Sequence, residues 1–112
     1  MTYKRFEVVR VPFPFTDKDA TKNRPALVLS DEFAFNAPAG HSVMAMITSE
    51  AHSAGPLDCV VQNLSAAGLP APSKVRLKLF TLDHHLVHGR LGQLAAEDAG
   101  RVQQALGRLL NL

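Results

Sequence analysis

The sequence is poor in cysteine and in long apolar runs, and both absences narrow the class of protein. Its 112 residues include a single cysteine, Cys59. One cysteine cannot form an internal disulfide, so the chain needs no oxidising compartment. No stretch approaches the apolar length of a membrane span, and the opening residues MTYKRFEVV lack the apolar core of a signal peptide. We therefore expect a cytoplasmic protein that does not contact a membrane.

Several patterns that carry chemistry are missing too. The sequence has no carboxylate pair placed for glycoside cleavage, no glycine-rich phosphate loop and no Cys/His spacing of the zinc type. His84 and His88 are four residues apart, but their segment has no convincing helical pattern. A turn with exposed imidazoles is the simpler interpretation. We expect neither a metal nor another cofactor.

What is present is the composition of an ordinary globular protein, with 46% hydrophobic and 20% charged residues. The length suits one domain, residues 1–112, with a single modest core. The net charge of +2 permits an anionic partner without identifying one. One short loop carries Lys18, Lys22 and Arg24. A second basic group alternates along a segment and comprises Lys74, Arg76 and Lys78, which in a strand would share one face, either solvated or following a phosphate backbone.

Short β-strands separated by turn-rich segments are expected along most of the chain. The predicted strands are 7–13, 25–30, 42–49, 57–62, 73–82 and 86–94, with loops at 17–23, 31–41 and 66–72. Gly89 and Gly92 in the last strand indicate a bulge or a sharp bend. From Glu97 onward the apolar residues recur at helical spacing. The pattern predicts a mainly β protein (α+β) in which a C-terminal helix lies against a small, strongly bent barrel.

An arginine and a threonine meet if the second and third predicted strands form an antiparallel hairpin. The pairing that matches their lengths sets Leu29 opposite Val43, and the same register sets Arg24 opposite Thr48. Directly opposed residues have Cβ atoms roughly 5 Å apart. Arginine grips a phosphate through two parallel hydrogen bonds and stabilises charge on its oxygens. Since RNA brings its own nucleophile, the 2′-hydroxyl, such a pair could promote RNA cleavage without a metal.

Five segments, in the correct order over nearly the whole chain, resemble the PemK/MazF family of toxin endoribonucleases. They are VVRVPFPFTD, RPALVLS, MITS, LPAPSKVRLKLFTLD and RLGQLAAEDAGRVQQALGRLL. The resemblance implies an SH3-like barrel of the CcdB/Kid/MazF type, a homodimer and the toxin role in a type II toxin–antitoxin system. Members cut single-stranded RNA, usually mRNA, at short motifs and leave a 2′,3′-cyclic phosphate and a 5′-hydroxyl. A cognate antitoxin blocks the site.

The resemblance places the family's catalytic arginine and threonine on Arg24 and Thr48. Arg24 would bind the scissile phosphate and stabilise the transition state, while Thr48 would hydrogen-bond a phosphate oxygen or help to protonate the leaving oxygen. The residues expected to bind RNA are Phe15, Thr16, Lys22, Ser49, Arg76 and Lys78. Without the resemblance, the simpler interpretation of the arginine would be an ion pair with Asp17, Asp19 or Asp31.

The chain departs from the family pattern at three places. The segment VRLKLF lacks the aspartate that some relatives carry near this point and use in catalysis, so the general base stays unassigned, with His84 or His85 as an option. Phe6 stands where relatives commonly have glycine. Ala95 stands where they commonly have a serine-like helix cap, a loss of about 1 kcal/mol if nothing replaces it.

Two other functions compete with RNA cleavage. A toxin of the same fold can act on a protein target, as the gyrase poison CcdB does, but that mode relies on a tryptophan near the C-terminus and this chain has none. A barrel that only binds RNA or a partner is the second alternative. We further expect the loop at 17–23 to be mobile and to lie over the site, and the antitoxin to dock across the same groove.

Overall fold

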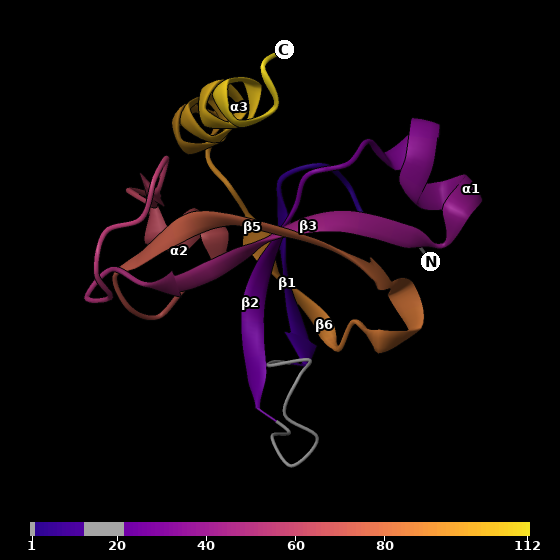
Figure 1. The fold of residues 1–112 in the computed structure, drawn as a ribbon. Helices are drawn as coiled ribbons and strands as arrows, with labels where there is room; N and C mark the ends of the chain where they lie inside the picture. The colour runs from indigo at the N-terminus through magenta and orange to yellow at the C-terminus, as the bar shows by residue number, and fades with distance from the viewer. Residues whose placement is uncertain (1, 13–21) are drawn as a thin grey trace.

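The computed structural model describes residues 2–12 and 22–112, in which six antiparallel strands form one strongly curved sheet (Figure 1). The strands are β1 (Glu7–Pro12), β2 (Asn23–Val28), β3 (His41–Ser49), β4 (Cys59–Val60), β5 (Ser73–Asp83) and β6 (Gly89–Gln93). Their order across the sheet is β4-β5-β3-β2-β1-β6. The expected mainly β architecture with a C-terminal helix is confirmed.

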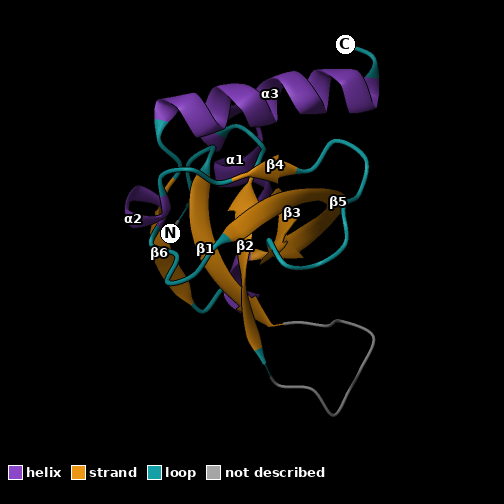
Figure 2. Cartoon of the chain, turned by 90° about the vertical axis from the view of Figure 1, so that its left-hand side faces the viewer, coloured by secondary structure: helices purple, strands orange, loops and turns teal. Residues whose placement is uncertain are grey.

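The helical segments lie between the strands and at the end of the chain. The short ones are η1 (Glu32–Asn36), α1 (Ala37–Ala39), α2 (Leu64–Ala67) and η2 (His84–Leu86). The long helix α3 (Ala96–Leu110) lies over one end of the curved sheet (Figure 2). Its N-cap is Ala95, which makes no side-chain capping bond, as the sequence predicted.

Two apolar clusters, one on each face of the sheet, form the core. Neighbouring residues of a strand alternate between them: Val8 belongs to the cluster that α3 covers, and Val9 to the opposite one. In β3, Ala45 and Met44 are divided in the same way, so both faces of this strand are buried. Because the central strands are closely packed on both faces, they form a rigid support for the edge where β2 and β3 end.

Two predicted strands are shorter than expected. The segment predicted at 57–62 pairs only over Cys59–Val60, because Leu57 has a left-handed φ of 63° and Asp58 folds back to accept a hydrogen bond from the Gly55 amide. The segment predicted from residue 86 begins its strand at Gly89, because Asp83 caps the preceding turn through the His85 amide.

The predicted irregularity in β6 is present. Val8 pairs with Gly92 and Val9 with Arg90, which leaves Leu91 as an extra residue. At this bulge α2 packs directly on β6. A Cβ on Gly92 would overlap the Ala66 carbonyl, so this contact requires glycine.

Phe6 has a left-handed φ of 67°. Its amide donates to the Val28 carbonyl (2.7 Å) and its carbonyl accepts from the Leu94 amide (3.0 Å). The Arg5 guanidinium lies 4.6 Å from the centre of its ring. These contacts hold a conformation that is unfavourable for a residue with a Cβ.

Candidate active site

The pairing of β2 with β3 has the register that the sequence predicted. Ala26 faces Met46, Val28 faces Met44, and the Leu29 amide donates to the Val43 carbonyl at 2.8 Å. Continued by two residues, this register sets Arg24 opposite Thr48. The ladder with β3 ends at Ala26, whereas β2 stays paired with β1 as far as Asn23. The two strands therefore part between Ala26 and Arg24.

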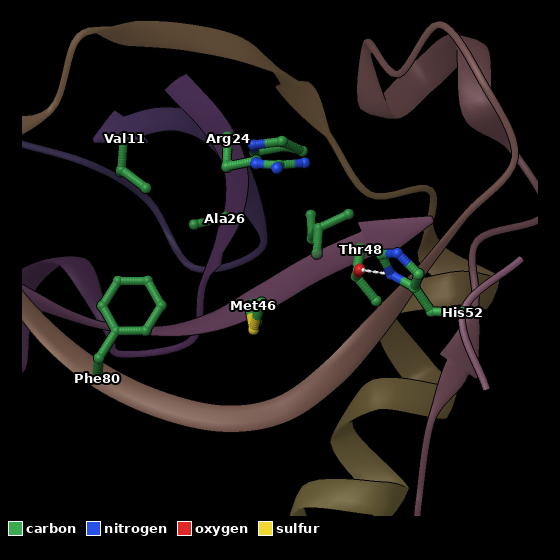
Figure 3. Close-up of a pocket in the computed structure, with 9 residues that line it drawn as sticks. Val11, Arg24, Ala26, Met46, Thr48, His52 and Phe80 are labelled. Carbon is green, nitrogen blue, oxygen red and sulfur yellow. Dashed lines mark hydrogen bonds between the residues drawn. The ribbon is translucent and has the colours of Figure 1, made fainter. Parts of the chain in front are cut away.

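A cavity of about 190 Å³ opens where β2 and β3 part (Figure 3). Arg24, Thr48 and His52 are its polar residues. The rest of its lining is apolar and consists of Val11, Pro25, Ala26, Met46, Ile47 and Phe80. A second hollow of about 200 Å³ shares Arg24 and Thr48 and continues to the segment 69–73. The two side chains thus stand between two adjoining hollows, an arrangement that suits an extended ligand.

Arg24 is exposed on the rim of both hollows. Within residues 2–12 and 22–112, no carboxylate lies at ion-pair distance from its guanidinium. Asp31, one alternative partner, accepts instead from the amides of Phe33 (3.0 Å) and Ala34 (2.8 Å). The other two, Asp17 and Asp19, lie outside the described residues. A guanidinium so placed is suited to an anionic ligand such as a phosphate.

Thr48 is hydrogen-bonded to a histidine that the sequence analysis did not single out. The turn after β3 is closed by the His52 amide, which donates to the Ser49 carbonyl (3.1 Å), and by the Ala51 amide, which donates to Ser49 Oγ (3.2 Å). The chain reverses here, and Thr48 Oγ1 lies 2.5 Å from His52 Nδ1 (Figure 3). The four-residue spacing in TSEAH, at a strand end followed by a turn, was the signal available in the sequence.

An ion cluster holds the loop that carries His52. Lys74 Nζ donates to the carbonyls of His52 (2.6 Å) and Ser53 (3.3 Å), and Arg76 Nη2 donates to the Ser53 carbonyl (2.5 Å). Both cations pair with Asp58, at 3.2 Å from Lys74 and 3.0 Å from Arg76. The hydrogen bond from Arg76 is the main cause that lowers the pKa of the Asp58 carboxyl from 3.8 to about 2, against the effect of burial. Asp58 in turn raises the pKa of Arg76. Asp58 and Arg76 are therefore both charged at neutral pH.

These contacts correct the interpretation of the basic residues of β5. Lys74, Arg76 and Lys78 do not form one exposed face, since Lys74 is only 5% exposed and Arg76 is engaged with Asp58. The expected alternation is interrupted because β5 gains two residues relative to β3, between the pairs Met46–Arg76 and Ala45–Leu79. Lys78 lies in this irregularity.

Of the remaining predicted RNA-binding residues, three lie at or near the hollows and two lie outside the described residues. Lys78 is exposed and lines a third hollow of about 370 Å³ together with Arg76, next to the His52 loop. Lys22 is exposed directly before β2, and Ser49 lies at the rim of the second hollow. Phe15 and Thr16 lie outside the described residues. The predicted mobile loop at 17–23 also falls mostly outside them.

The histidines after β5 are engaged with neighbouring side chains. His84 Nε2 lies 2.7 Å from the buried Ser42 Oγ. This imidazole is partly buried, whereas the sequence predicted an exposed one. His85 is exposed and pairs with Asp83 at 3.0 Å. His88 Nδ1 lies 2.5 Å from Asn23 Oδ1. In the part of the chain that the structure covers, no group of His, Cys, Asp or Glu side chains is arranged to hold a metal ion. No helix there is both long and apolar enough to cross a membrane.

Comparison with known proteins gives one consistent family. The model of the PemK-like, MazF-like toxins of type II toxin–antitoxin systems matches residues 4–110. MazF from Deinococcus radiodurans is 23% identical, with a TM-score of 0.76 over 100% of this chain and 99% of that one. A MazE–MazF structure from the same organism is 22% identical, with a TM-score of 0.78 over 100% and 99%. A mycobacterial endoribonuclease in complex with its cognate antitoxin is 19% identical, with a TM-score of 0.77 over 98% and 96%. No curated protein matches. The similarity to the solved structures confirms the expected MazF-type fold.

Proposed function

Since the chain belongs to the PemK-like, MazF-like toxins of type II toxin–antitoxin systems, we propose that it is an endoribonuclease that cleaves single-stranded RNA, chiefly mRNA. One observation carries the proposal. Arg24 and Thr48 come from two neighbouring strands and line the same cavity at the point where those strands part.

In the proposed reaction the RNA supplies the nucleophile. Its 2′-oxygen forms a bond to phosphorus while the bond from phosphorus to the 5′-oxygen breaks, which yields a 2′,3′-cyclic phosphate and a 5′-hydroxyl. Charge accumulates on the non-bridging oxygens in the transition state. Arg24 binds these oxygens as a permanent cation, and the Thr48 hydroxyl lies beside it in the same cavity, within reach of the reacting ribose phosphate. In this assignment Arg24 neutralises the phosphate, so the reaction needs no metal ion for that purpose.

The two hollows beside Arg24 and Thr48 suit the nucleotides on either side of the scissile phosphate. One has an apolar lining that includes Phe80 and Met46, a surface on which a base can pack. We assign the phosphates beyond it to the exposed Lys22 and Lys78, with Ser49 at the rim and Phe15 and Thr16 as further contacts. Arg76 adds positive charge near these phosphates although it is paired with Asp58.

The partners follow from the same proposal. We expect a homodimer that acts in the cytoplasm on mRNA and a cognate antitoxin that covers the groove. The Deinococcus MazE–MazF structure and the mycobacterial endoribonuclease are both complexes with an antitoxin. An antitoxin segment with apolar and acidic residues would complement the apolar cavity and the cationic Arg24 at its rim.

The test is cleavage of one defined transcript by the purified chain in the presence of EDTA, with the cut positions and the chemistry of the new ends determined. We expect cuts that leave a 2′,3′-cyclic phosphate. Arg24→Ala should lower the rate by about 100-fold or more, because it removes the charge that stabilises the transition state. Arg108→Ala, at an exposed position in the last turn of α3, is the matched control and should cut normally. Intact RNA together with inhibited gyrase would support the alternative toxin mode.

A further inference from the structure

The proposed RNA cleavage leaves one step without a residue, the removal of the proton from the attacking 2′-hydroxyl. Arg24 cannot supply this step, because a guanidinium stays protonated in proteins. Thr48 is not a base by itself. Of the nine residues that line the cavity, His52 alone is of a type that commonly serves as a general base.

We propose that His52 is the proton acceptor of this reaction and that the Thr48 hydroxyl connects it to the RNA. This inference rests on the proposed function. Thr48 Oγ1 and His52 Nδ1 are 2.5 Å apart, and both residues line the cavity that Arg24 borders. When the hydroxyl donates to Nδ1, the remaining lone pairs of Oγ1 are free to accept from a 2′-hydroxyl in the cavity. A histidine bound in this way makes a threonine competent to relay a proton.

The step balances without a further reactant. The bond from the 2′-oxygen to phosphorus forms and the bond from phosphorus to the 5′-oxygen breaks. The 2′-proton passes to Thr48 Oγ1 while the hydroxyl proton of Thr48 passes to His52 Nδ1. The leaving 5′-oxygen takes a proton from solvent, and His52 later returns its own proton to solvent. Nothing is oxidised or reduced and no water is consumed.

The fold holds His52 in place although the residue is exposed. The carbonyl of His52 accepts from Lys74 Nζ, a side chain that is only 5% exposed, and the next carbonyl accepts from both Lys74 and Arg76. Asp58, at the other end of the same loop, forms ion pairs with both cations. A buried lysine is costly unless its charge is compensated. Because the buried Lys74 holds two carbonyls of this loop, we infer that the position of the loop is important. A proton acceptor has to stay within reach of Thr48.

The experiment measures single-turnover cleavage and RNA affinity for the wild-type chain and for His52→Ala and His52→Asn. The asparagine variant keeps an acceptor oxygen near the position of Nδ1, so it preserves the bond to Thr48 but cannot take the proton. We expect both variants to bind RNA normally and to cut it about 100-fold more slowly or worse. Added imidazole should restore much of the rate to His52→Ala, because the truncation leaves room for it.

Two control variants separate the possible results. His41→Ala removes an exposed imidazole at the start of β3, outside the cavity, and should cut at the wild-type rate. Arg24→Ala should be slow and should not respond to imidazole. The inference is overturned, with the proposed function intact, if His52→Asn cuts at the wild-type rate, or if His52→Ala binds RNA and imidazole does not restore its rate. If the wild-type chain leaves RNA uncut, the proposed function fails and the inference fails with it.

Discussion

Asp58 and Arg76 form a two-point ion pair beside the candidate site, with Nε 3.3 Å from Oδ1 and Nη2 3.0 Å from Oδ2. The pair joins the loop before β4 to the middle of β5. Lys74 adds a third charge from the same strand. Because both cations pair with Asp58, the stability of the loop depends on the ionisation of this carboxylate.

The first prediction concerns acid. The pKa of Asp58 is about 2 in the folded chain and 3.8 without these contacts, so its stabilisation is complete above about pH 4 and is lost as the pH falls towards 2. The shift corresponds to about 2 kcal/mol. Urea unfolding of the wild-type chain and of Asp58→Asn between about pH 5 and pH 2 checks this. The difference in unfolding free energy between the two chains should shrink by that amount as the pH falls. A difference that stays constant would contradict the assigned role of the carboxylate.

A second prediction separates the cations assigned to the RNA path from an exposed cation elsewhere on the surface. Lys22→Ala and Lys78→Ala should each weaken RNA binding and lower the salt slope of the binding constant by about 0.7, the value for one phosphate contact on a single strand. Arg108→Ala, on the far end of α3, should leave the slope unchanged. The measurements use the Thr48→Ala chain, so that cleavage does not interfere. Equal slopes for all three variants would remove Lys22 and Lys78 from the RNA path.

The meeting of Arg24 and Thr48 could be predicted from the sequence because it follows from a register. The pairing that matches the lengths of the two predicted strands is the one the structure has, and a slip of one residue would exchange Met44 and Ala45 between the two clusters. The terminal helix was predictable for a similar reason, since its apolar period is local. Its missing cap was visible in one residue, Ala95.

His52 could not be found in this way. The segment that carries it has only turn signals. Its position depends on the charged side chain of Lys74, which is 22 residues away in the sequence and pairs with Asp58. The same cause explains the error over Lys74. Alternation in a strand predicts which side chains share a face, but it does not show that a neighbouring loop covers that face with a carboxylate. Residues held by long-range charge pairs leave no periodic signal in the chain.

A third prediction tests the contact between α2 and β6. Gly92→Ala should destabilise the fold by about 2–3 kcal/mol, because the new methyl group would overlap the backbone at Ala66 and Ala67. Gly100→Ala in α3 is the matched control. Among the described residues, nothing outside the neighbouring backbone of α3 lies within 4 Å of the position of its Cβ. Since alanine is also the better helix former, this change should stabilise the protein by about 1 kcal/mol. Thermal unfolding of both variants should therefore show shifts of opposite sign. A Gly92→Ala variant that is as stable as the wild type would mean that α2 does not pack tightly against the β6 backbone.

The last prediction concerns the uncapped start of α3. Ala95 has φ −62° and ψ 153°, the extended conformation of an N-cap residue, and makes no side-chain bond to the helix. A hollow of about 60 Å³ beside it leaves room for a hydroxyl. Ala95→Ser should therefore accept a hydrogen bond from the first-turn amide of Glu97 or Asp98 and stabilise the protein by about 1 kcal/mol.

That gain should raise the melting temperature by about 4 °C for a chain of this size. Ala95→Val is the control, since valine adds volume at the same position without an acceptor and is no better than alanine as a cap. Asp98 does not already serve this end of the helix, because its buried carboxylate accepts from the amides of Gln62 (3.1 Å) and Asn63 (2.9 Å). A serine variant that melts at the same temperature as the valine variant would show that the first-turn amides of α3 are satisfied by water.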